Sequence, residues 1–370
     1  MAERRLNVLA LPRYGRTAPS SRYRILQFVP ALAAQGIDIE VSPLLGDWYM
    51  AGLLAQRHPP LLPLVGAYLR RIRLLLRRRR PDLIWIEKEL LPWLPWLFER
   101  ALLGVRAPVL LDLDDSQFHR YDQSGSAVVR ALLGDKIDRG MAAARIVTCG
   151  SPYIAERACR SGAARVVDLP TAIDLARYPP APGAGDGAAD GQARSKAFVI
   201  GWIGTPGNTH YLSAIEEPLR RLASEIPLRI LVIGGRPGIL SGLPVEYRAW
   251  SEAGEIVDLQ GIDVGVMPLP DRPWERGKCG LKLLQYMASS KPTIASPVGV
   301  NTVLVESGVT GFLADGTEDW LSSLRRLYAD PPLRRAMGAA GRRRIEQSYS
   351  LAVTAPRMAA LMREAAGGRT

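Results

Sequence analysis

Short apolar runs alternate with helical patterns throughout the first half of the chain. The apolar runs have the length of buried strands, and the segments between them carry apolar residues at helical spacing. Strands that alternate with helices are typical of βαβ units, which build a parallel sheet. The first half is therefore expected to be an α/β domain.

The strands of this half are expected in NVLALP, IDIEVSPL, DLIWIEK, PVLLDLDD, RIVTCG and RVVDLP. A helix follows the first of them, and we expect Ser20 or Ser21 to cap it and Gly36 to end it. Further helical patterns cover a region that ends at Arg80 and the ranges 92–103 and 126–143.

The composition changes after Tyr178. Residues 179–196 are rich in Gly, Ala and Pro and lack periodic apolar positions, so they are predicted to be a linker. Beyond it the alternation restarts, with strands expected in AFVIGWIG, LRILVIGG, VGVMPLP, PTIASPVG and GFLA. Helices are expected at 209–224, 280–289 and 300–307, and then to the end of the chain with breaks at Pro331–Pro332 and around Gly341.

The length agrees with two domains, because 370 residues exceed what one hydrophobic core usually supports. We expect a first α/β domain over 1–178, a second over 197–350, and a terminal helix within 351–370. The three cysteines lack metal-finger spacing, so the sequence predicts neither disulfides nor a metal site and favours a reducing, cytoplasmic location.

The charge is strongly positive, at +12 with a pI of about 9.9, which suits phosphorylated ligands, an anionic membrane or nucleic acid. Nucleic acid is not expected, because the basic residues lack interleaved aromatic residues. Many of them lie at Arg70, Arg71, Arg73 and Arg77–Arg80, directly after LLPLVGAYL. This Arg70–Arg80 region is either an amphipathic helix on the inner face of a membrane or a solvated surface helix.

Ligands of open parallel sheets bind at the carboxyl ends of the strands, where loops lead into helix N-termini. Three loops of the second half present glycines, hydroxyls and backbone amides of the kind that a diphosphate requires. The donor-binding candidates in them are Gly204, Thr205, Asn208, Arg276, Gly280, Gln285, Ser296, Val298, Gly299, Val300 and Asn301. In the first and third loops, a purely structural turn would use similar residues.

The middle loop, DRPWERGKCGLKLLQ, carries most of the argument. If a helix begins near Gly280, Lys278 stands at its start and Lys282 lies in its first turn. Cations there oppose the helix dipole, so they are unfavourable unless an anion lies between them. We predict that both lysines bind a diphosphate and stabilise its charge as it departs, which is a catalytic role. The alternative is a pair of solvated lysines, and Gln285 is expected at a ribose.

Candidates in the first domain lie where its strands end. Gly15 follows the first strand, where the chain can approach the donor phosphates. The candidates for the acceptor side are Arg22, Arg24, Glu87, Asp112, Asp114 and Asp115. The three aspartates form a costly like-charge cluster unless hydroxyls, cations or raised pKa values relieve it. They either contact acceptor hydroxyls or cap the next element.

The chain resembles the retaining glycosyltransferases of family 4, chiefly from Ile262 to Ala314 and also in PVLLDLDD, LPTAIDLARY, GWIGTPGNTHYL and MGAAGRRRIEQSYS. The resemblance implies the GT-B fold, in which two Rossmann-like domains face each other across a cleft. It implies retaining transfer of a hexosyl unit from a nucleoside diphosphate sugar, with no required cofactor or metal. The acceptor would be a sugar, a glycan or a lipid-linked molecule in polysaccharide or glycolipid biosynthesis.

The chain departs from the family pattern at the site. Many members have two glutamates eight positions apart, where this chain has Gly277 and Gln285. Many also have an Arg and a Lys after the first strand of the second domain, which this chain lacks; Lys278, Lys282 and Arg276 are expected to supply that charge. The departures keep a second hypothesis open, namely an inactive sugar-nucleotide-binding or partner subunit of a glycan assembly system.

Overall fold

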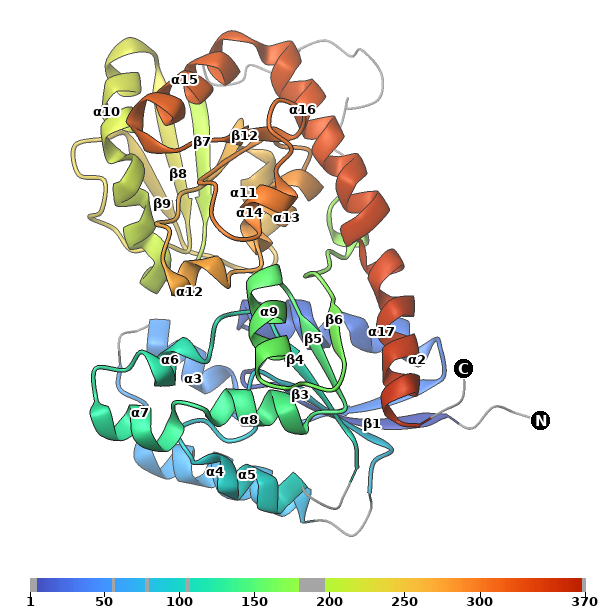
Figure 1. Ribbon diagram of the computed structural model, residues 1–370. Helices are drawn as coiled ribbons and strands as arrows, with labels where there is room; N and C mark the ends of the chain where they lie inside the picture. The colour runs from blue at the N-terminus through green and yellow to red at the C-terminus, as the bar shows by residue number, and fades with distance from the viewer. Residues whose placement is uncertain (1–4, 55–56, 77–79, 104–106, 180–196, 368–370) are drawn as a thin grey trace. The chain divides into compact units, whose positions relative to one another are not determined.

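The computed structural model describes residues 5–54, 57–76, 80–103, 107–179 and 197–367. It contains two compact units, each a parallel sheet with helices packed against it (Figure 1). The first unit comprises Met1–Ala172, Arg276–Cys279 and Leu351–Thr370, and the second comprises Ile173–Glu275 and Gly280–Ser350. The predicted linker lies outside the described residues except for Pro179, and so do residues 77–79 of the arginine run.

The sheet of the first unit has six strands in the order β2-β1-β3-β4-β5-β6, and all neighbouring strands are parallel. The strands are β1 (Leu6–Leu11), β2 (Ile37–Val41), β3 (Leu83–Glu87), β4 (Val109–Leu113), β5 (Ile146–Cys149) and β6 (Val166–Asp168). β3 and β4 are almost entirely buried, as is usual for central strands covered by helices on both faces. Their carboxyl ends meet at one edge of the sheet.

Helices of the first unit surround this sheet. They are α1 (Pro19–Ser21), the π-helix η1 (Arg22–Leu26), α2 (Phe28–Ala33), α3 (Asp47–Leu54), α4 (Leu61–Leu75), α5 (Trp96–Leu103), α6 (His119–Asp122), α7 (Ala127–Leu133), α8 (Lys136–Ala143), α9 (Pro152–Arg160) and α17 (Leu351–Ala365). The last of them belongs to the core of this unit, where Met358 and Met362 pack with Phe28, Leu32 and Trp85.

The start of the first helix differs from the sequence-based expectation. Ala18 is the N-cap and Pro19 is the first helical residue, so the predicted cap at Ser20 or Ser21 is wrong. Proline suits that position, because its fixed φ matches the helix and its missing N–H is not needed there. The helix ends at Ala33 with Ala34 as its C-cap, and Gly36, with a φ of 78°, lies in the turn that follows, three residues beyond the last helical residue.

The sheet of the second unit also has six parallel strands, in the order β12-β11-β10-β7-β8-β9. The strands are β7 (Phe198–Ile203), β8 (Leu228–Ile233), β9 (Val245–Arg248), β10 (Val264–Met267), β11 (Thr293–Ala295) and β12 (Gly311–Leu313). The helical segments are the 3-10 helices η2 (Leu175–Arg177) and η3 (Pro206–Ile215), then α10 (Glu216–Glu225), α11 (Glu255–Gln260), α12 (Pro273–Arg276), α13 (Leu281–Ala288), α14 (Asn301–Leu304), α15 (Gly316–Ala329), α16 (Pro331–Arg344) and the π-helix η4 (Ile345–Tyr349).

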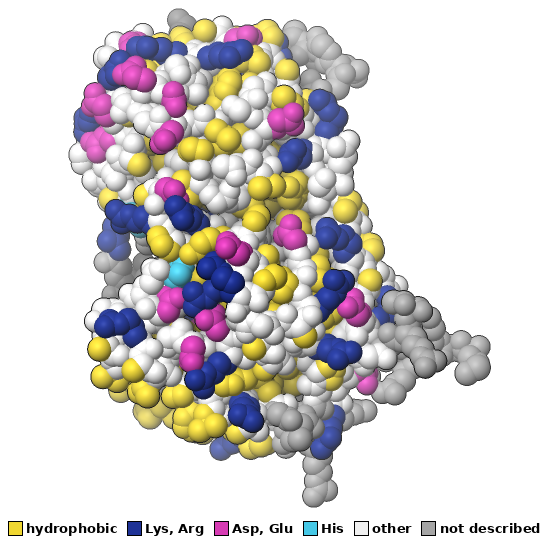
Figure 2. Space-filling model, viewed as in Figure 1, with side chains coloured by type: hydrophobic (Ala, Val, Ile, Leu, Met, Phe, Trp, Pro, Cys, Tyr) yellow, Lys and Arg dark blue, Asp and Glu magenta, His cyan; other side chains and the backbone are white. Residues whose placement is uncertain are grey.

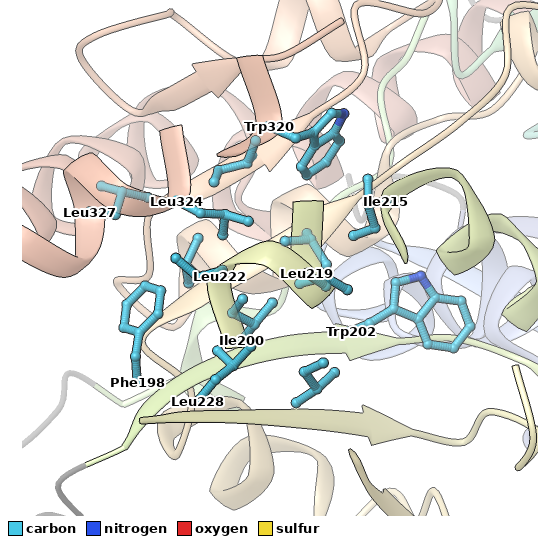
Figure 3. Close-up of a cluster of buried hydrophobic side chains, with 14 of the residues drawn as sticks. Phe198, Ile200, Trp202, Ile215, Leu219, Leu222, Leu228, Trp320, Leu324 and Leu327 are labelled. Carbon is cyan, nitrogen blue, oxygen red and sulfur yellow. The ribbon is translucent and has the colours of Figure 1, made fainter. Parts of the chain in front are cut away.

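The core of the second unit lies between the sheet and the helices that follow its first strand and its last strand (Figure 3). Phe198 and Ile200 of β7 contact a layer that α10 supplies through Leu219 and that α15 supplies through Leu324. Apolar residues at helical spacing in both helices produce this layer, as the sequence pattern indicates. The helix predicted at 280–289 is confirmed as α13.

Two expectations in the second unit are wrong. The helix predicted at 300–307 spans only Asn301–Leu304. Gly341 does not break the helix, because it lies inside α16, where its missing side chain leaves room for Met287; α-helical geometry ends instead at η4. A glycine can therefore mark a close helix contact as well as a helix end. Within the described residues, no helix has the length and apolarity to cross a bilayer.

Two helical glycines should respond in opposite ways to substitution by alanine. A Cβ at Gly338 of α16 would clash with the carbonyl oxygen of Ser290, whereas a Cβ at Gly66 of α4 would have nothing within 4 Å. We expect Gly338→Ala to destabilise the protein by roughly 1–3 kcal/mol through overpacking. Gly66→Ala should stabilise α4 by up to about 1 kcal/mol, because alanine loses less backbone entropy on folding. Calorimetric melting temperatures test both, and equal shifts would contradict the packing at Gly338.

Candidate functional site

The carboxyl edge of the second sheet is held together by a buried tyrosine. The Tyr286 hydroxyl accepts a hydrogen bond from the backbone N–H of Ile203 at 3.1 Å and donates to the carbonyl oxygen of Val266 at 3.3 Å. Burial raises the pKa of Tyr286, so the hydroxyl keeps its proton for this bridge. The bridge fixes α13 against the ends of β7 and β10.

Lys282 lies in the first turn of α13, one turn before Tyr286. Its ammonium nitrogen is 5.2 Å from the ring centroid of Trp202. Its Cε would lie only 3.1 Å from a Cβ at Gly204, so the side chain runs along the glycine that follows β7. Gly280 caps α13 with a φ of 67°, a left-handed conformation that favours glycine, and a Cβ there would clash with Leu304.

The other donor-binding candidates of this unit line the first and third loops. Asn208 donates to the Thr205 hydroxyl at 3.2 Å, next to Gly204. In the third loop the Ser296 hydroxyl accepts from the backbone N–H of Leu269 at 3.0 Å, and Asn301 donates to the Ser296 carbonyl oxygen at 3.0 Å. The Oδ1 atom of the buried Asn301 has no hydrogen-bond partner within the part of the chain that the structure describes.

Val298, Gly299 and Val300 form the turn between Ser296 and α14. Both valines are buried, and Gly299 has a φ of 53°. The turn therefore has a packing role of its own beside the contact to a donor that the sequence predicts.

Gln285 faces the interior of the second unit. Its amide nitrogen is 3.5 Å from the Tyr178 hydroxyl, which donates to Glu255 at 2.9 Å. The indole N–H of Trp250 donates to the same carboxylate at 2.8 Å. The predicted contact of Gln285 with a ribose stays a prediction.

The segment Arg276–Cys279 groups with the first unit. Within that unit, a Cβ at Gly277 would clash with the hydroxyl of Ser116, so a glutamate does not fit at this position. Lys278 is half-buried, and its charge opposes the rise in the pKa of Asp115 that burial causes. Arg276 is exposed. Lys278 is thus described with one unit and Lys282 with the other.

A buried ion pair occupies the carboxyl edge of the first sheet. Arg24 donates to both oxygens of Asp112, at 2.8 and 2.5 Å, and also to the carbonyl oxygen of Leu169 at 3.0 Å. The Thr148 hydroxyl donates to the same aspartate at 2.6 Å. Every oxygen of Asp112 is therefore occupied, and the pair links the end of β4 to the chain that follows β6.

The next carboxylate along the chain is paired with Lys88. The ammonium group of Lys88 lies 3.1 Å from Asp114 and donates to the Ser20 hydroxyl at 2.9 Å. Burial raises the pKa of Asp114, but Lys88 and Arg24 outweigh it and hold the pKa below its usual range. Lys88 has a φ of 66°, an unusual conformation for a residue with a side chain, which directs it to this contact.

Glu87 is a buried acidic group with unused hydrogen-bonding capacity. One oxygen accepts from the Ser21 hydroxyl at 2.6 Å and from the backbone N–H of Arg13 at 3.2 Å. The other, Oε1, has no hydrogen-bond partner in the described ranges of the chain. Burial raises the pKa of Glu87 to about 7, although the charge of Lys88 opposes the rise.

The structure therefore brings the acceptor-side candidates to one edge of the first sheet. Arg24 and the Thr148 hydroxyl compensate Asp112, Lys88 compensates Asp114, and burial raises the pKa of Asp115. Arg22 is buried there with its guanidinium 5.1 Å from the ring centroid of Tyr23. Gly15 lies close by in the loop after β1, where a Cβ would clash with Asp47.

A second buried network lies beside this edge, and sequence reasoning missed its cations Arg13 and Lys136. Lys136 lies 2.9 Å from Glu89 and 3.0 Å from Glu99, and Arg13 donates to Glu89 at 2.8 Å. The position of Arg13 directly after the first strand is a signal that could have revealed it. These charges balance one another, so the network is structural.

Glu275 of the second unit was also missed. It is buried, it accepts from the Tyr211 hydroxyl at 2.5 Å, and its other oxygen has no partner among the described residues. Its position two residues before Gly277 was the available signal. The described ranges contain no group of three or more His, Cys, Asp or Glu side chains placed to hold a metal ion.

Residues 197–330 match the family model for glycosyl transferases group 1. The chain is also similar to the D-inositol 3-phosphate glycosyltransferase of Kineococcus radiotolerans, with 26% identity over 209 residues that cover 50% of this chain and 48% of that protein. The same enzyme of Nocardia farcinica is 30% identical over 195 residues, which cover 47% of this chain and 42% of that protein. The chain spans about half the length of the curated relatives it matches.

Solved structures match the fold over nearly all of the chain. Sucrose-phosphate synthase from Thermosynechococcus elongatus has a TM-score of 0.69 and 18% identity, covering 97% of this chain and 99% of that one. HepE of Anabaena in complex with UDP-glucose has a TM-score of 0.67 and 15% identity, and the match covers 97% of this chain and 100% of that one. With two parallel six-stranded sheets in the chain, these matches confirm the predicted α/β fold class of two Rossmann-like domains, as in GT-B structures.

The titration of Glu87 should be visible in stability. The folded pKa is about 7, whereas an exposed glutamate titrates near about 4.3, so the folded state binds this proton more tightly. The proton on Glu87 therefore contributes to the free energy of unfolding. This contribution is fully present below about pH 4 and is lost as the pH rises through about 7. The variant Glu87→Gln keeps an acceptor oxygen but does not titrate, so its stability relative to the unmodified protein should rise by roughly 1–3 kcal/mol between pH 5 and pH 8.

Urea denaturation at both pH values measures this difference. Glu156→Gln, at an exposed position of α9 in the same unit, is the matched control. A Glu87→Gln effect that does not change with pH would contradict the raised pKa.

Proposed function

We propose that this chain is a glycosyltransferase that moves a hexosyl unit from a nucleoside diphosphate sugar to a hydroxyl acceptor, with retention of anomeric configuration. The observation that carries the proposal is the placement of Lys282 in the first turn of α13, beside Gly204 and over Trp202. A cation there opposes the helix dipole, and an anionic ligand would relieve that opposition. The match of residues 197–330 to glycosyl transferases group 1 covers this lysine.

The proposed donor site collects charge and amides around a diphosphate. Lys282 would stabilise negative charge on the diphosphate as its bond to the sugar breaks. The same role for Lys278 and Arg276 stays a prediction from the sequence. Within the second unit, the remaining donor contacts would come from Gly204, Thr205, Asn208, Gly280, Gln285, Ser296, Val298, Gly299, Val300 and Asn301. The contact of Gly15 with the donor stays a prediction from the sequence. UDP-glucose in the similar HepE structure supports a donor of this class.

In the proposed reaction, the acceptor hydroxyl attacks the anomeric carbon from the face that the diphosphate leaves. A new carbon–oxygen bond forms as the old one breaks, and the hydroxyl proton passes to a phosphate oxygen of the leaving group. The chain then needs neither a covalent nucleophile nor a metal. This route gives retention and uses the electrostatic role assigned to Lys282.

The proposed acceptor side is the carboxyl edge of the first sheet. Arg24 and Asp112 neutralise each other and would position the edge, whereas Glu87, Asp114 and Asp115 would receive acceptor hydroxyls. We propose a sugar, glycan or lipid-linked acceptor in polysaccharide or glycolipid biosynthesis, at the inner face of the cytoplasmic membrane. The basic segment after LLPLVGAYL supports that location.

One observation favours a second candidate, an inactive donor-binding or partner subunit. Gly277 stands where many similar enzymes have a glutamate, and the packing against Ser116 leaves no room for that side chain. Incubation of the purified chain with donor separates the two candidates. Transfer, or slow hydrolysis of the donor to free sugar, supports the enzyme; binding without either supports the partner subunit.

A thermal-shift screen with UDP-, GDP-, ADP- and TDP-sugars tests the donor site first. A ligand that binds the folded state alone raises the melting temperature by mass action. The anomeric configuration of the product, read by NMR, then tests retention. If no member of the panel shifts the melting temperature, the donor site is refuted, and an inverted product refutes the retaining route.

Lys282→Ala should lower the turnover number about a hundredfold to a thousandfold, because the variant loses a charge aimed at the leaving group. Arg326→Ala is a matched control, since Arg326 lies over the ring of Phe312 at 5.4 Å from its centroid, much as Lys282 lies over Trp202. Its turnover should stay near that of the unmodified protein. Circular dichroism checks that both variants fold, and near-normal turnover in Lys282→Ala would remove the assignment.

A further inference from the structure

Helix α4 has an apolar stripe that faces away from the core. Its buried side consists of Ala67, Arg71 and Leu75, which recur every four residues. Its outward side carries four apolar residues that are between 46% and 85% exposed, namely Leu61, Leu62, Val65 and Leu69. Single exposed leucines are ordinary, but a continuous exposed stripe along one helix marks a surface that binds something.

The stripe continues onto the neighbouring helix. Trp93, Leu97 and Phe98, at and before the start of α5, are each more than half exposed. The Tyr68 hydroxyl of α4 donates to the carbonyl oxygen of Pro92 at 2.7 Å, which ties α4 to the residue before Trp93. Figure 2 shows hydrophobic side chains gathered at this end of the first unit. We define the apolar face as Leu61, Leu62, Val65, Leu69, Trp93, Leu97 and Phe98.

The chain segment that contains α4 carries charge of one sign. Residues 48–81 contain eight arginines and no aspartate or glutamate. Of the described arginines near the face, Arg73, Arg80 and Arg100 are exposed. The one acidic residue of α5, Glu99, is buried beside Lys136 at 3.0 Å. A surface that covers the face therefore meets cations at its border.

Two arginines of the basic segment bind the protein itself, although the composition of the segment suggests that they would bind a membrane. Arg71 is buried and donates to the carbonyl oxygens of Pro12 and Ser42, at 3.0 and 2.9 Å. Arg70 donates to the carbonyl oxygen of Leu44 at 3.0 Å. They hold α4 on the unit, so the outward side of α4 is apolar and its border is basic.

We propose that the apolar face docks onto an anionic phospholipid bilayer, with α4 in the plane of the membrane and its leucines among the lipid headgroups and upper acyl chains. The border of arginines selects this occupant, because lipid phosphates supply the matching charge at every point around the face. This inference rests on the proposed function for its purpose, since a docked enzyme would meet a lipid-linked acceptor. It identifies the residues that would make the membrane contact included in the proposed function.

Vesicle flotation of the full chain tests the proposal. We expect binding to vesicles of phosphatidylcholine mixed with phosphatidylglycerol, little binding to phosphatidylcholine alone, and weaker binding in high salt. The variant Leu61→Ser/Leu62→Ser/Val65→Ser keeps every charge and should lower vesicle partitioning about tenfold or more. Arg73→Glu/Arg80→Glu should lower it as well. The control Val257→Ser/Val309→Ser, at exposed valines of the second unit, should bind like the unmodified chain.

Three results would overturn the proposal. The first is no binding of the unmodified chain to the mixed vesicles, and the second is unchanged binding of the triple serine variant. The third is a dimer in analytical ultracentrifugation that the serine substitutions abolish, because a second copy would then cover the face. Thermal shifts with the sugar-nucleotide panel in the absence of vesicles separate the two proposals. If vesicle binding persists without any donor shift, the proposed function fails and the docking surface stands.

Discussion

Charge compensation without water is the constraint on which the first unit depends. A carboxylate as deeply buried as Asp112 is tolerated only when cations and hydrogen bonds occupy its oxygens, and Arg24 and Thr148 provide them. The same arginine holds the chain beyond β6, so the neutralising contact also sets the shape of this edge. Lys88 supplies the opposite charge for Asp114. The edge is thus assembled before any ligand arrives, and Glu87 is left with an unsatisfied oxygen.

The sequence was sufficient for the alternation of strands and helices, because central parallel strands such as β3 and β7 are continuous apolar runs. It was insufficient where burial is partial. β9 (Val245–Arg248) is an edge strand with four half-buried residues, so it has no apolar run to reveal it. Pro19 and Gly341 both mark structural features, but not the expected ones. Pro19 is the first residue of a helix that a serine was expected to cap. Gly341 allows close packing inside a helix that it was expected to break.

The site was less accessible from the sequence than the fold. The aspartates of the first unit could be placed from the sequence, because they directly follow a predicted strand. The residues that form ion pairs with them could not be deduced. Arg24 lies 88 residues from Asp112, and nothing in the spacing of either announces the pair. Lys282 could be recognised as a candidate from the sequence, because a cation in the first turn of a helix opposes the helix dipole and the start of the helix is visible in the local sequence. Gly277 is understood only with the structure, where the hydroxyl of Ser116 occupies the space of a side chain.

The position of α17 in the first unit has a consequence for biosynthesis. Met358 and Met362 complete a core whose other members, such as Phe28 and Trp85, leave the ribosome more than two hundred residues earlier. During translation this face of the amino-terminal sheet is therefore only partly covered while the whole second unit is made and can fold. A nascent chain in that state exposes apolar surface to chaperones, and frameshifts or stop codons near the 3′ end of the message would damage the part of the protein encoded first.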